Sequence, residues 1–116
     1  MLEVQIFTLY PDLYPGLLDV GIYKKAKEQQ KWSLKIVDIR DYAFDNNRTV
    51  DDTPFGGGSG MLLKPDVVAA ALDKNIKSKE KIIYLSPKGK RLDQNKVTLL
   101  SKLKKINILC GHVEGI

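Results

Sequence analysis

Three segments of the chain carry residue types and spacings that could bind a ligand or act on it. They read DDTPFGGGSGM over residues 51–61, YLSPKG over residues 84–89 and CGHVEG over residues 110–115. Glu114 is the best single candidate for a polar ligand contact, because it stands beside a glycine in a segment that follows an apolar run. His112, the only histidine, could act as a base or a hydrogen-bond donor, or it could be a surface residue without a role.

The glycine-rich segment is typical of a loop that packs or binds a ligand. Four of the five residues 56–60 are glycines, and glycine suits a backbone that needs a positive φ or a close approach to another group. Pro54 fixes its own φ and biases Thr53 toward an extended conformation. A flexible linker is the alternative, but such linkers are usually Ser-rich, polar and longer. Phe55 and Met61 flank the glycines and favour burial.

This segment fits neither of two familiar phosphate-binding motifs. A Walker A loop requires Lys and then Ser or Thr directly after its last glycine, where this sequence has Met61 and Leu62. A dinucleotide-binding fingerprint follows a strand and has its last glycine three residues after its second. Here acidic and proline-containing sequence precedes the glycines, and position 61 is not glycine.

Several other residues have a structural explanation beside a chemical one. Asp51 and Asp52 could orient Arg48 or a substrate, or they could form an Asx turn leading into Pro54. Cys110 ends an apolar run, which favours a buried packing role over that of a nucleophile. Because the chain has one histidine and one cysteine, we expect no metal site built from it.

Length and composition indicate a single globular domain over residues 1–116. The chain is 43% hydrophobic and 28% charged, and 116 residues suffice for one core but not for two ordinary domains. No apolar run approaches the about 20 residues of a membrane span, and the first residues do not resemble a signal peptide. Together with the single cysteine, these features predict a cytoplasmic protein. The net charge of +5 favours polyanionic partners, nucleic acids among them.

Short apolar runs alternate with segments of helical periodicity along the chain. Strands are predicted at residues 2–9, 32–39, 81–85 and 105–110, and helices at residues 16–30, 65–72 and 93–103. The run at 81–85 is typical of a strand buried on both faces, and residues 74–81 read as a charged connector. Pro65 suits a helix start and Asp93 a helix N-cap. The lysines of the first helix could touch phosphate or simply face solvent.

The alternation of strands and helices predicts an α/β fold with a mainly parallel sheet and flanking helices. In open parallel sheets, ligands bind outside the carboxyl ends of the strands. Residues 84–89 and residues 110–115 both follow a predicted strand. We therefore expect these two segments to face one crevice.

Four motifs stand in the order of one known family. They are TLYPDLY (residues 8–14), RTVDDTPFGGGSGM (48–61), YLSPKG (84–89) and CGHVEGI (110–116). On these motifs the chain resembles the N-terminal part of the bacterial tRNA (guanine-N1)-methyltransferases, which are knotted enzymes of the SPOUT class. The resemblance runs from about residue 2 to the last residue.

The resemblance implies a function and a set of site residues. The family uses S-adenosylmethionine to methylate N1 of the guanine next to the anticodon, and it acts as a homodimer. By resemblance, two loops surround the methyl donor, formed by Tyr84, Leu85, Ser86 and Pro87 and by Gly111, Val113, Glu114 and Gly115. Glu114 matches an acid near the donor and the target base, so it is the expected catalytic residue. The expected contacts to the target guanine are Arg48, Asp51, Gly57, Gly58 and Gly60.

Two departures from the family pattern change what we expect of this chain. Val113 stands where an aromatic residue is usual. The family also continues into further knot strands, with a third donor loop, a catalytic aspartate, an arginine partner and a tRNA-binding domain that have no counterpart here. We therefore expect a SPOUT-like domain that lacks its C-terminal knot segment and is inactive by itself. The alternative is an inactive or structural remnant that at most binds tRNA.

Overall fold

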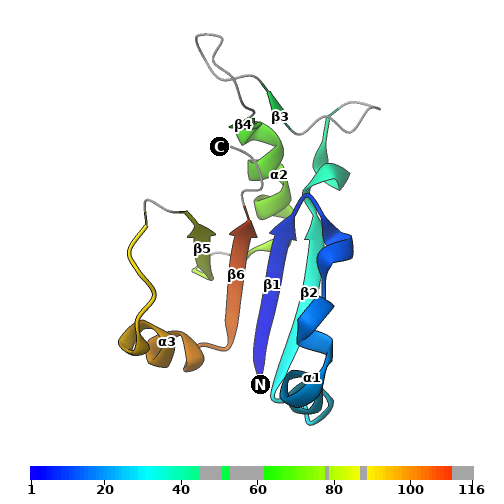
Figure 1. Cartoon of the computed structure of the whole chain (residues 1–116). Helices are drawn as coiled ribbons and strands as arrows, with labels where there is room; N and C mark the ends of the chain where they lie inside the picture. The colour runs from blue at the N-terminus through cyan, green and yellow to red at the C-terminus, as the bar shows by residue number, and fades with distance from the viewer. Residues whose placement is uncertain (45–50, 53–61, 78, 87–88, 111–116) are drawn as a thin grey trace.

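A four-stranded parallel sheet forms the centre of the molecule (Figure 1). The computed structural model describes residues 1–44, 51–52, 62–77, 79–86 and 89–110. The strands are β1 (Leu2–Thr8), β2 (Trp32–Asp38), β5 (Lys81–Leu85) and β6 (Lys105–Cys110), in the spatial order β2-β1-β6-β5. Every neighbouring pair in this sheet is parallel. The four predicted strands and the predicted parallel arrangement are confirmed.

A second, very small sheet stands apart from the first. It pairs β3 (Asp51–Asp52) with β4 (Leu62–Leu63) in antiparallel fashion, with Asp51 opposite Leu63. The sequence pattern predicted no strand here, because two residues are too few to show an alternation. The expectation that residues 56–60 form an irregular loop falls outside the described residues.

The segment between β1 and β2 contains three short helical elements instead of one predicted helix over residues 16–30. They are the 3-10 helices η1 (Pro11–Leu13) and η2 (Gly16–Asp19) and the helix α1 (Gly21–Glu28). Val20 separates η2 from α1 with an extended backbone (φ −134°, ψ 158°), and Gly21 follows with φ +57°. Glycine adopts this left-handed conformation with little strain, so the chain turns here although the apolar spacing continues.

Two further helices begin where the sequence predicts. The helix α2 (Pro65–Asn75) has Pro65 in its first turn, and it extends beyond the predicted end at residue 72 into the predicted connector. The helix α3 (Gln94–Ser101) begins after Asp93, whose Oδ1 accepts a hydrogen bond from the Lys96 backbone N–H at 2.8 Å. A third 3-10 helix, η3 (Ile39–Tyr42), follows β2. None of the described helices is long and apolar enough to cross a bilayer.

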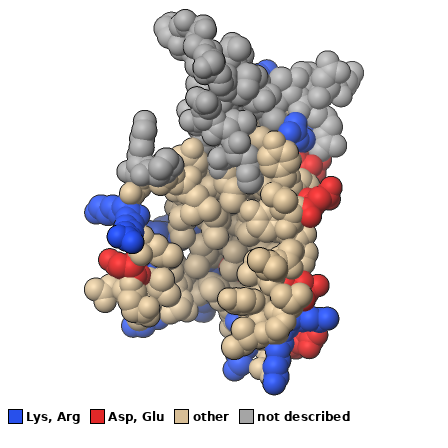
Figure 2. Space-filling view, viewed as in Figure 1, with Lys and Arg blue, Asp and Glu red and all other residues tan. Residues whose placement is uncertain are grey.

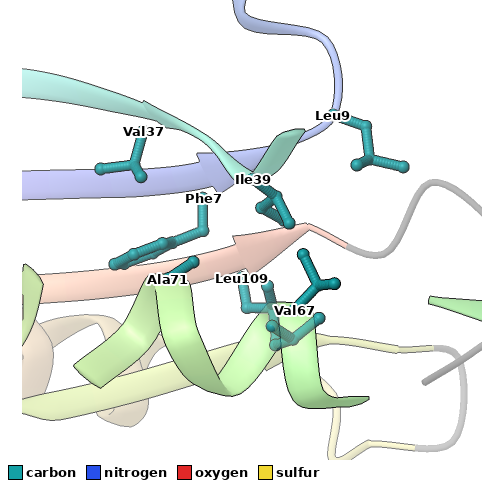
Figure 3. Close-up of a cluster of buried hydrophobic side chains, with 8 residues drawn as sticks. Phe7, Leu9, Val37, Ile39, Val67, Ala71 and Leu109 are labelled. Atoms are coloured by element: carbon teal, nitrogen blue, oxygen red, sulfur yellow. The ribbon is translucent and has the colours of Figure 1, made fainter. Parts of the chain in front are cut away.

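The hydrophobic core lies between one face of the sheet and α2 (Figure 3). Alternate side chains of a strand point to the same face, so β1 and the residue after it contribute Phe7 and Leu9. Val67 and Ala71 meet them from α2, one helical turn apart. The other buried apolar members of the cluster are Val37, Ile39, Val68 and Leu109. Removing these side chains from water supplies the main favourable term in folding.

The prediction that β5 is buried on both faces was wrong. Ile82 is 45% exposed, Tyr84 43% and Leu85 55%. Within the described part of the chain, β5 is an edge strand that pairs with β6 alone. None of the residues of α3 is buried, so this helix does not cover β5 closely. An apolar run shows that a strand suits burial, but it does not show whether neighbours are present on both sides.

Candidate functional site

The carboxyl ends of β5 and β6 lie side by side. The two strands are parallel neighbours, and their register pairs Tyr84 with Leu109 and Leu85 with Cys110. The segments that follow β5 and β6 therefore leave the sheet at the same end, outside the carboxyl ends of the strands, where parallel sheets bind their ligands. The first residues of the segments 84–89 and 110–115 are thus neighbours, and the expectation that the two segments face one crevice stays a prediction. The continuation after Cys110 falls outside the described residues.

The chain turns immediately after β5. Ser86, partly buried, is the first residue beyond the strand, and its carbonyl accepts a hydrogen bond from the Gly89 backbone N–H at 3.1 Å. This bond spans three residues, as in a β-turn. A Cβ at Gly89 would lie 3.4 Å from the Ser86 carbonyl oxygen, which is an ordinary van der Waals contact. The strand pairing holds Tyr84 and Leu85 beside the end of β6, and Ser86 follows them directly.

The predicted site residues divide into a described set and an undescribed set. The structure places Tyr84, Leu85 and Ser86 together at the end of β5, and Asp51 in β3. The remaining predicted residues lie outside the described residues: Arg48, Gly57, Gly58, Gly60, Pro87, Gly111, Val113, Glu114 and Gly115. His112 lies outside them as well. Their roles stay predictions.

Tyr14 lies against the end of β6. Its hydroxyl oxygen is 3.6 Å from the Sγ of Cys110, within hydrogen-bonding range of a sulfur atom. This hydrogen bond, with burial and the charge of a thiolate as smaller causes, raises the pKa of Tyr14 to about 12. The prediction that Cys110 is buried is confirmed. The contact joins the segment of residues 8–14 to the strand end that carries the candidate site.

A chain of buried amides links the strands below the candidate site. Gln5 Nε2 of β1 donates to Asn107 Oδ1 of β6 at 2.8 Å and to the Asn75 carbonyl of α2 at 3.1 Å. Asn107 Nδ2 in turn donates to the Lys81 carbonyl of β5 at 3.1 Å. Such buried bonds hold neighbouring elements in one geometry, because leaving a buried amide unpaired costs free energy.

An ion pair supports the start of β5. Glu80 Oε1 lies 2.8 Å from the Nζ of Lys105 at the start of β6. The hydrogen bond from Lys105 is the largest cause that holds the pKa of Glu80 below its ordinary value, and burial opposes it. The pair therefore stabilises the fold above the ordinary carboxyl pKa, and this contribution is lost as the pH falls through the lowered pKa.

Comparisons with known proteins match nearly the whole chain. The family model described as "tRNA (Guanine-1)-methyltransferase TrmD" matches residues 2–116. The chain belongs to this family. The curated tRNA (guanine-N(1)-)-methyltransferase of Pelagibacter ubique is 58% identical over 116 residues, which are 100% of this chain and 51% of the relative. That of Rhodospirillum rubrum is 44% identical over 115 residues, which are 99% of this chain and 48% of the relative.

A solved structure from the same family supports the fold. The tRNA (m1G37) methyltransferase of Aquifex aeolicus matches with a TM-score of 0.86 and 34% identity, over 98% of this chain and 52% of that one. The SPOUT-like fold predicted from the sequence motifs is thereby confirmed for the part of the domain that this chain represents. The chain spans about half the length of the curated relatives it matches.

Three residues that support the strands of the candidate site were not predicted from the sequence. Tyr14 belongs to a recognised motif, yet nothing local indicates that it reaches Cys110, 96 positions away. Gln5 and Asn107 stand at the polar positions of alternating runs, a pattern that favours solvent exposure, and yet both side chains are buried. In the described part of the chain, no group of His, Cys, Asp or Glu is suited to hold a metal ion.

Proposed function

We propose that the chain is part of a tRNA (guanine-N1)-methyltransferase that acts on the guanine next to the anticodon. The observation that carries the proposal is the pairing of Leu85 with Cys110, which brings the first residues of the YLSPKG and CGHVEG motifs side by side at the carboxyl ends of two parallel strands. Membership of the family supports the reaction class. The proposal includes one domain over residues 1–116 and a cytoplasmic location, where tRNA is found.

The methyl donor in this proposal is S-adenosylmethionine, bound at the ends of β5 and β6. Tyr84 and Leu85 are half exposed there, and Ser86 is a partly buried polar residue beside them. Partly exposed apolar side chains beside a few polar groups suit a nucleoside, which has an apolar ring and polar edges. The other donor contacts in the proposal are Pro87, Gly111, Val113, Glu114 and Gly115.

The residues of the chain would position the two reactants and move one proton. When bound, S-adenosylmethionine would supply a methyl group on a sulfonium to the guanine N1 and would leave as the neutral thioether. The strand-end residues hold the reacting atoms in line, which can supply a large part of a rate enhancement. Glu114 accepts the proton from N1 as a general base. Arg48, Asp51, Gly57, Gly58 and Gly60 contact the target guanosine.

Homodimer formation is a further part of the proposal. Several large apolar side chains of the segment between β1 and β2 are exposed, and monomeric proteins seldom expose large contiguous apolar patches. They are Leu13, Leu17, Val20, Ile22 and Tyr23. A partner copy of the chain would remove such surface from water.

Isothermal titration calorimetry with S-adenosylmethionine tests the proposal. We expect saturable heat from the 116-residue chain. The Leu85→Arg substitution should weaken donor binding by about tenfold or more, because a long cation at the strand end obstructs the site and repels the sulfonium. Val97→Arg, at a residue of α3 that is 41% exposed, is the matched control and should bind normally.

The alternative function is that of a remnant without methyl transfer, which at most binds tRNA. The chain spans about half the length of the curated relatives it matches. Absence of any heat with S-adenosylmethionine, from a chain that is folded by circular dichroism, would support the remnant and reject donor binding.

A further inference from the structure

The elements η3 and α2 stand on either side of the small β3–β4 sheet along the chain. η3 ends at Tyr42 and α2 begins at Pro65, and both strands of the small sheet lie between these residues. Leu63, the last residue of β4, pairs with Asp51 of β3, and Lys64 alone separates β4 from α2 (Figure 1). The place of α2 therefore decides where β4 lies, and through β4 it decides where β3 holds Asp51.

One hydrogen bond joins η3 directly to α2. Asn75, the last residue of α2, uses its side-chain Nδ2 to donate to the Tyr42 hydroxyl oxygen at 2.8 Å and to the Ala71 carbonyl at 2.7 Å. An amide nitrogen of this kind carries two hydrogens, so both acceptors can be served. Tyr42 and Asn75 are both partly buried, and Tyr42 packs against the core cluster. The bond therefore fastens η3 to the last turn of α2.

The backbone of the same residue fastens α2 to the sheet. The carbonyl of Asn75 accepts a hydrogen bond from Nε2 of Gln5 in β1 at 3.1 Å, and Gln5 is only 1% exposed. The last carbonyls of a helix have no partner within the helix, and a buried one without a partner costs free energy. Asn75 thus contacts η3 with its side chain and β1 with its backbone.

Apolar packing alone does not set the register of α2 along the sheet. Val67, Val68 and Ala71 are buried in the core cluster, but the hydrophobic effect that holds them is non-directional. A hydrogen bond, in contrast, requires a defined distance and angle. Without the bond between Asn75 and Tyr42, the helix would stay on the core but could shift or rotate along it. Such a shift would carry β4 with it.

We propose that Asn75 is a positioning residue for the target guanosine, because its bond to Tyr42 sets the place of α2 and so that of Asp51. The inference rests on the proposed function in one respect, since the contact between Asp51 and the guanosine belongs to that proposal. Neither Asn75 nor Tyr42 is among the proposed contacts to donor or guanosine. Their effect would reach the reaction through α2 and β4.

Fluorescence anisotropy of the 116-residue chain tests the inference with two labelled anticodon stem–loops. They differ only in having guanine or adenine at the target position, and the ratio of their dissociation constants gives the preference for guanine. Tyr42→Phe removes the hydroxyl that accepts from Asn75, and Tyr23→Phe removes the hydroxyl of an exposed tyrosine on α1 as the matched control. Both variants keep the Lys and Arg side chains that Figure 2 shows, so general attraction to RNA is unchanged.

We expect Tyr42→Phe to lower the preference for guanine by about two- to tenfold, in line with the loss of one hydrogen bond. Affinity for the adenine stem–loop and the heat with S-adenosylmethionine should stay the same, which a general loss of folding would not allow. Adding Tyr42→Phe to Asn75→Ala should cause no further loss, because the bond is already absent. The amide resonances of Asp51 and Leu63 should shift in Tyr42→Phe and stay in place in Tyr23→Phe.

Three results would overturn the inference and leave the proposed function standing. They are an unchanged preference for guanine in Tyr42→Phe, an equal loss in Tyr23→Phe, and additive losses in the Tyr42→Phe/Asn75→Ala variant. A natural chain without preference for guanine would reject the guanosine contact of the proposed function, and the positioning role with it. Absence of donor heat, with the preference for guanine intact and dependent on Tyr42, would reject donor binding alone.

Discussion

The contact between Tyr14 and Cys110 lies at the carboxyl end of β6, beside the candidate site. The Tyr14 hydroxyl oxygen, in the segment after β1, lies 3.6 Å from the Sγ of Cys110, the last residue of β6. Cys110 is buried and Tyr14 is partly buried. A neutral hydrogen bond of this kind contributes about 0.5–1.5 kcal/mol. We expect this hydrogen bond to help hold Cys110 in place, and with it the point at which the chain leaves β6.

The raised pKa of Tyr14 makes this contact sensitive to alkaline pH. The pKa is about 12 in the folded chain and about 10 for an ordinary tyrosine. The favourable contribution is therefore complete below pH 10 and is lost as the pH rises through 12. We expect Tyr14→Phe to lower stability by about 0.5–1.5 kcal/mol at pH 8. The difference from the natural chain should shrink toward pH 12.

Urea unfolding at pH 8, 10 and 11.5, followed by circular dichroism, measures this effect. Tyr23→Phe is the control, since Tyr23 is an exposed tyrosine on α1. A stability difference for Tyr14→Phe that is the same at all three pH values would contradict the assigned pKa. A difference of equal size in both variants would show that the contact with Cys110 has no specific effect.

At the scale of elements, α3 depends on its cap more than the other helices do. None of its residues is buried, so packing contributes little to its stability. The side chain of Asp93 satisfies the Lys96 N–H, one of the amides that have no partner within the helix. Replacing such a cap by alanine costs about 0.5–2 kcal/mol.

We expect Asp93→Ala to unfold α3 locally while the sheet stays intact. The amide of Lys96 should then exchange its hydrogen at least about tenfold faster, in line with a loss of 1.4 kcal/mol or more. Hydrogen exchange followed by nuclear magnetic resonance measures this directly. Asn95→Ala changes a polar residue in the same helix without touching the cap, and it should leave the exchange rate similar or slower. Unchanged exchange at Lys96 in Asp93→Ala would contradict the role of the cap.

At the scale of the whole molecule, methyl transfer demands more than donor binding. The reaction needs a base for the N1 proton and a donor for the charge that develops at O6 of the guanine. The candidates near the strand ends in this sequence are Glu114 and His112. Loss of general acid or base help typically costs about 10²- to 10⁴-fold in rate.

We therefore expect these 116 residues to methylate unmodified tRNA at least about 10²-fold more slowly than the same chain extended to the length of its relatives. The assay supplies labelled S-adenosylmethionine and a transcript with guanine at the target position. Glu114→Gln in the extended chain is the control for the proposed base, and it should reduce the rate without loss of donor heat. Comparable turnover by the short and extended chains would refute the expectation.

The sequence by itself determined the strands, their alternation with helices and the family. Apolar runs, Pro65 and Asp93 are local signals, and the structure confirms the elements they predict. The four motifs identified the family because their order along the chain is specific, and the family comparison confirms it. The predicted roles of Glu114 and the glycine segment came from the same source and remain predictions.

Only the tertiary structure decided which elements are neighbours and which surfaces are covered. The edge position of β5 exposes Tyr84 and Leu85, although their apolar run alone predicted burial on both faces. The contact between Tyr14 and Cys110 and the bond between Gln5 and Asn107 join residues 96 and 102 positions apart. Local sequence patterns depend on residues that are close along the chain, whereas these contacts depend on the order of the strands in the sheet. The sheet order places β6 between β1 and β5, and that arrangement brings the candidate site together.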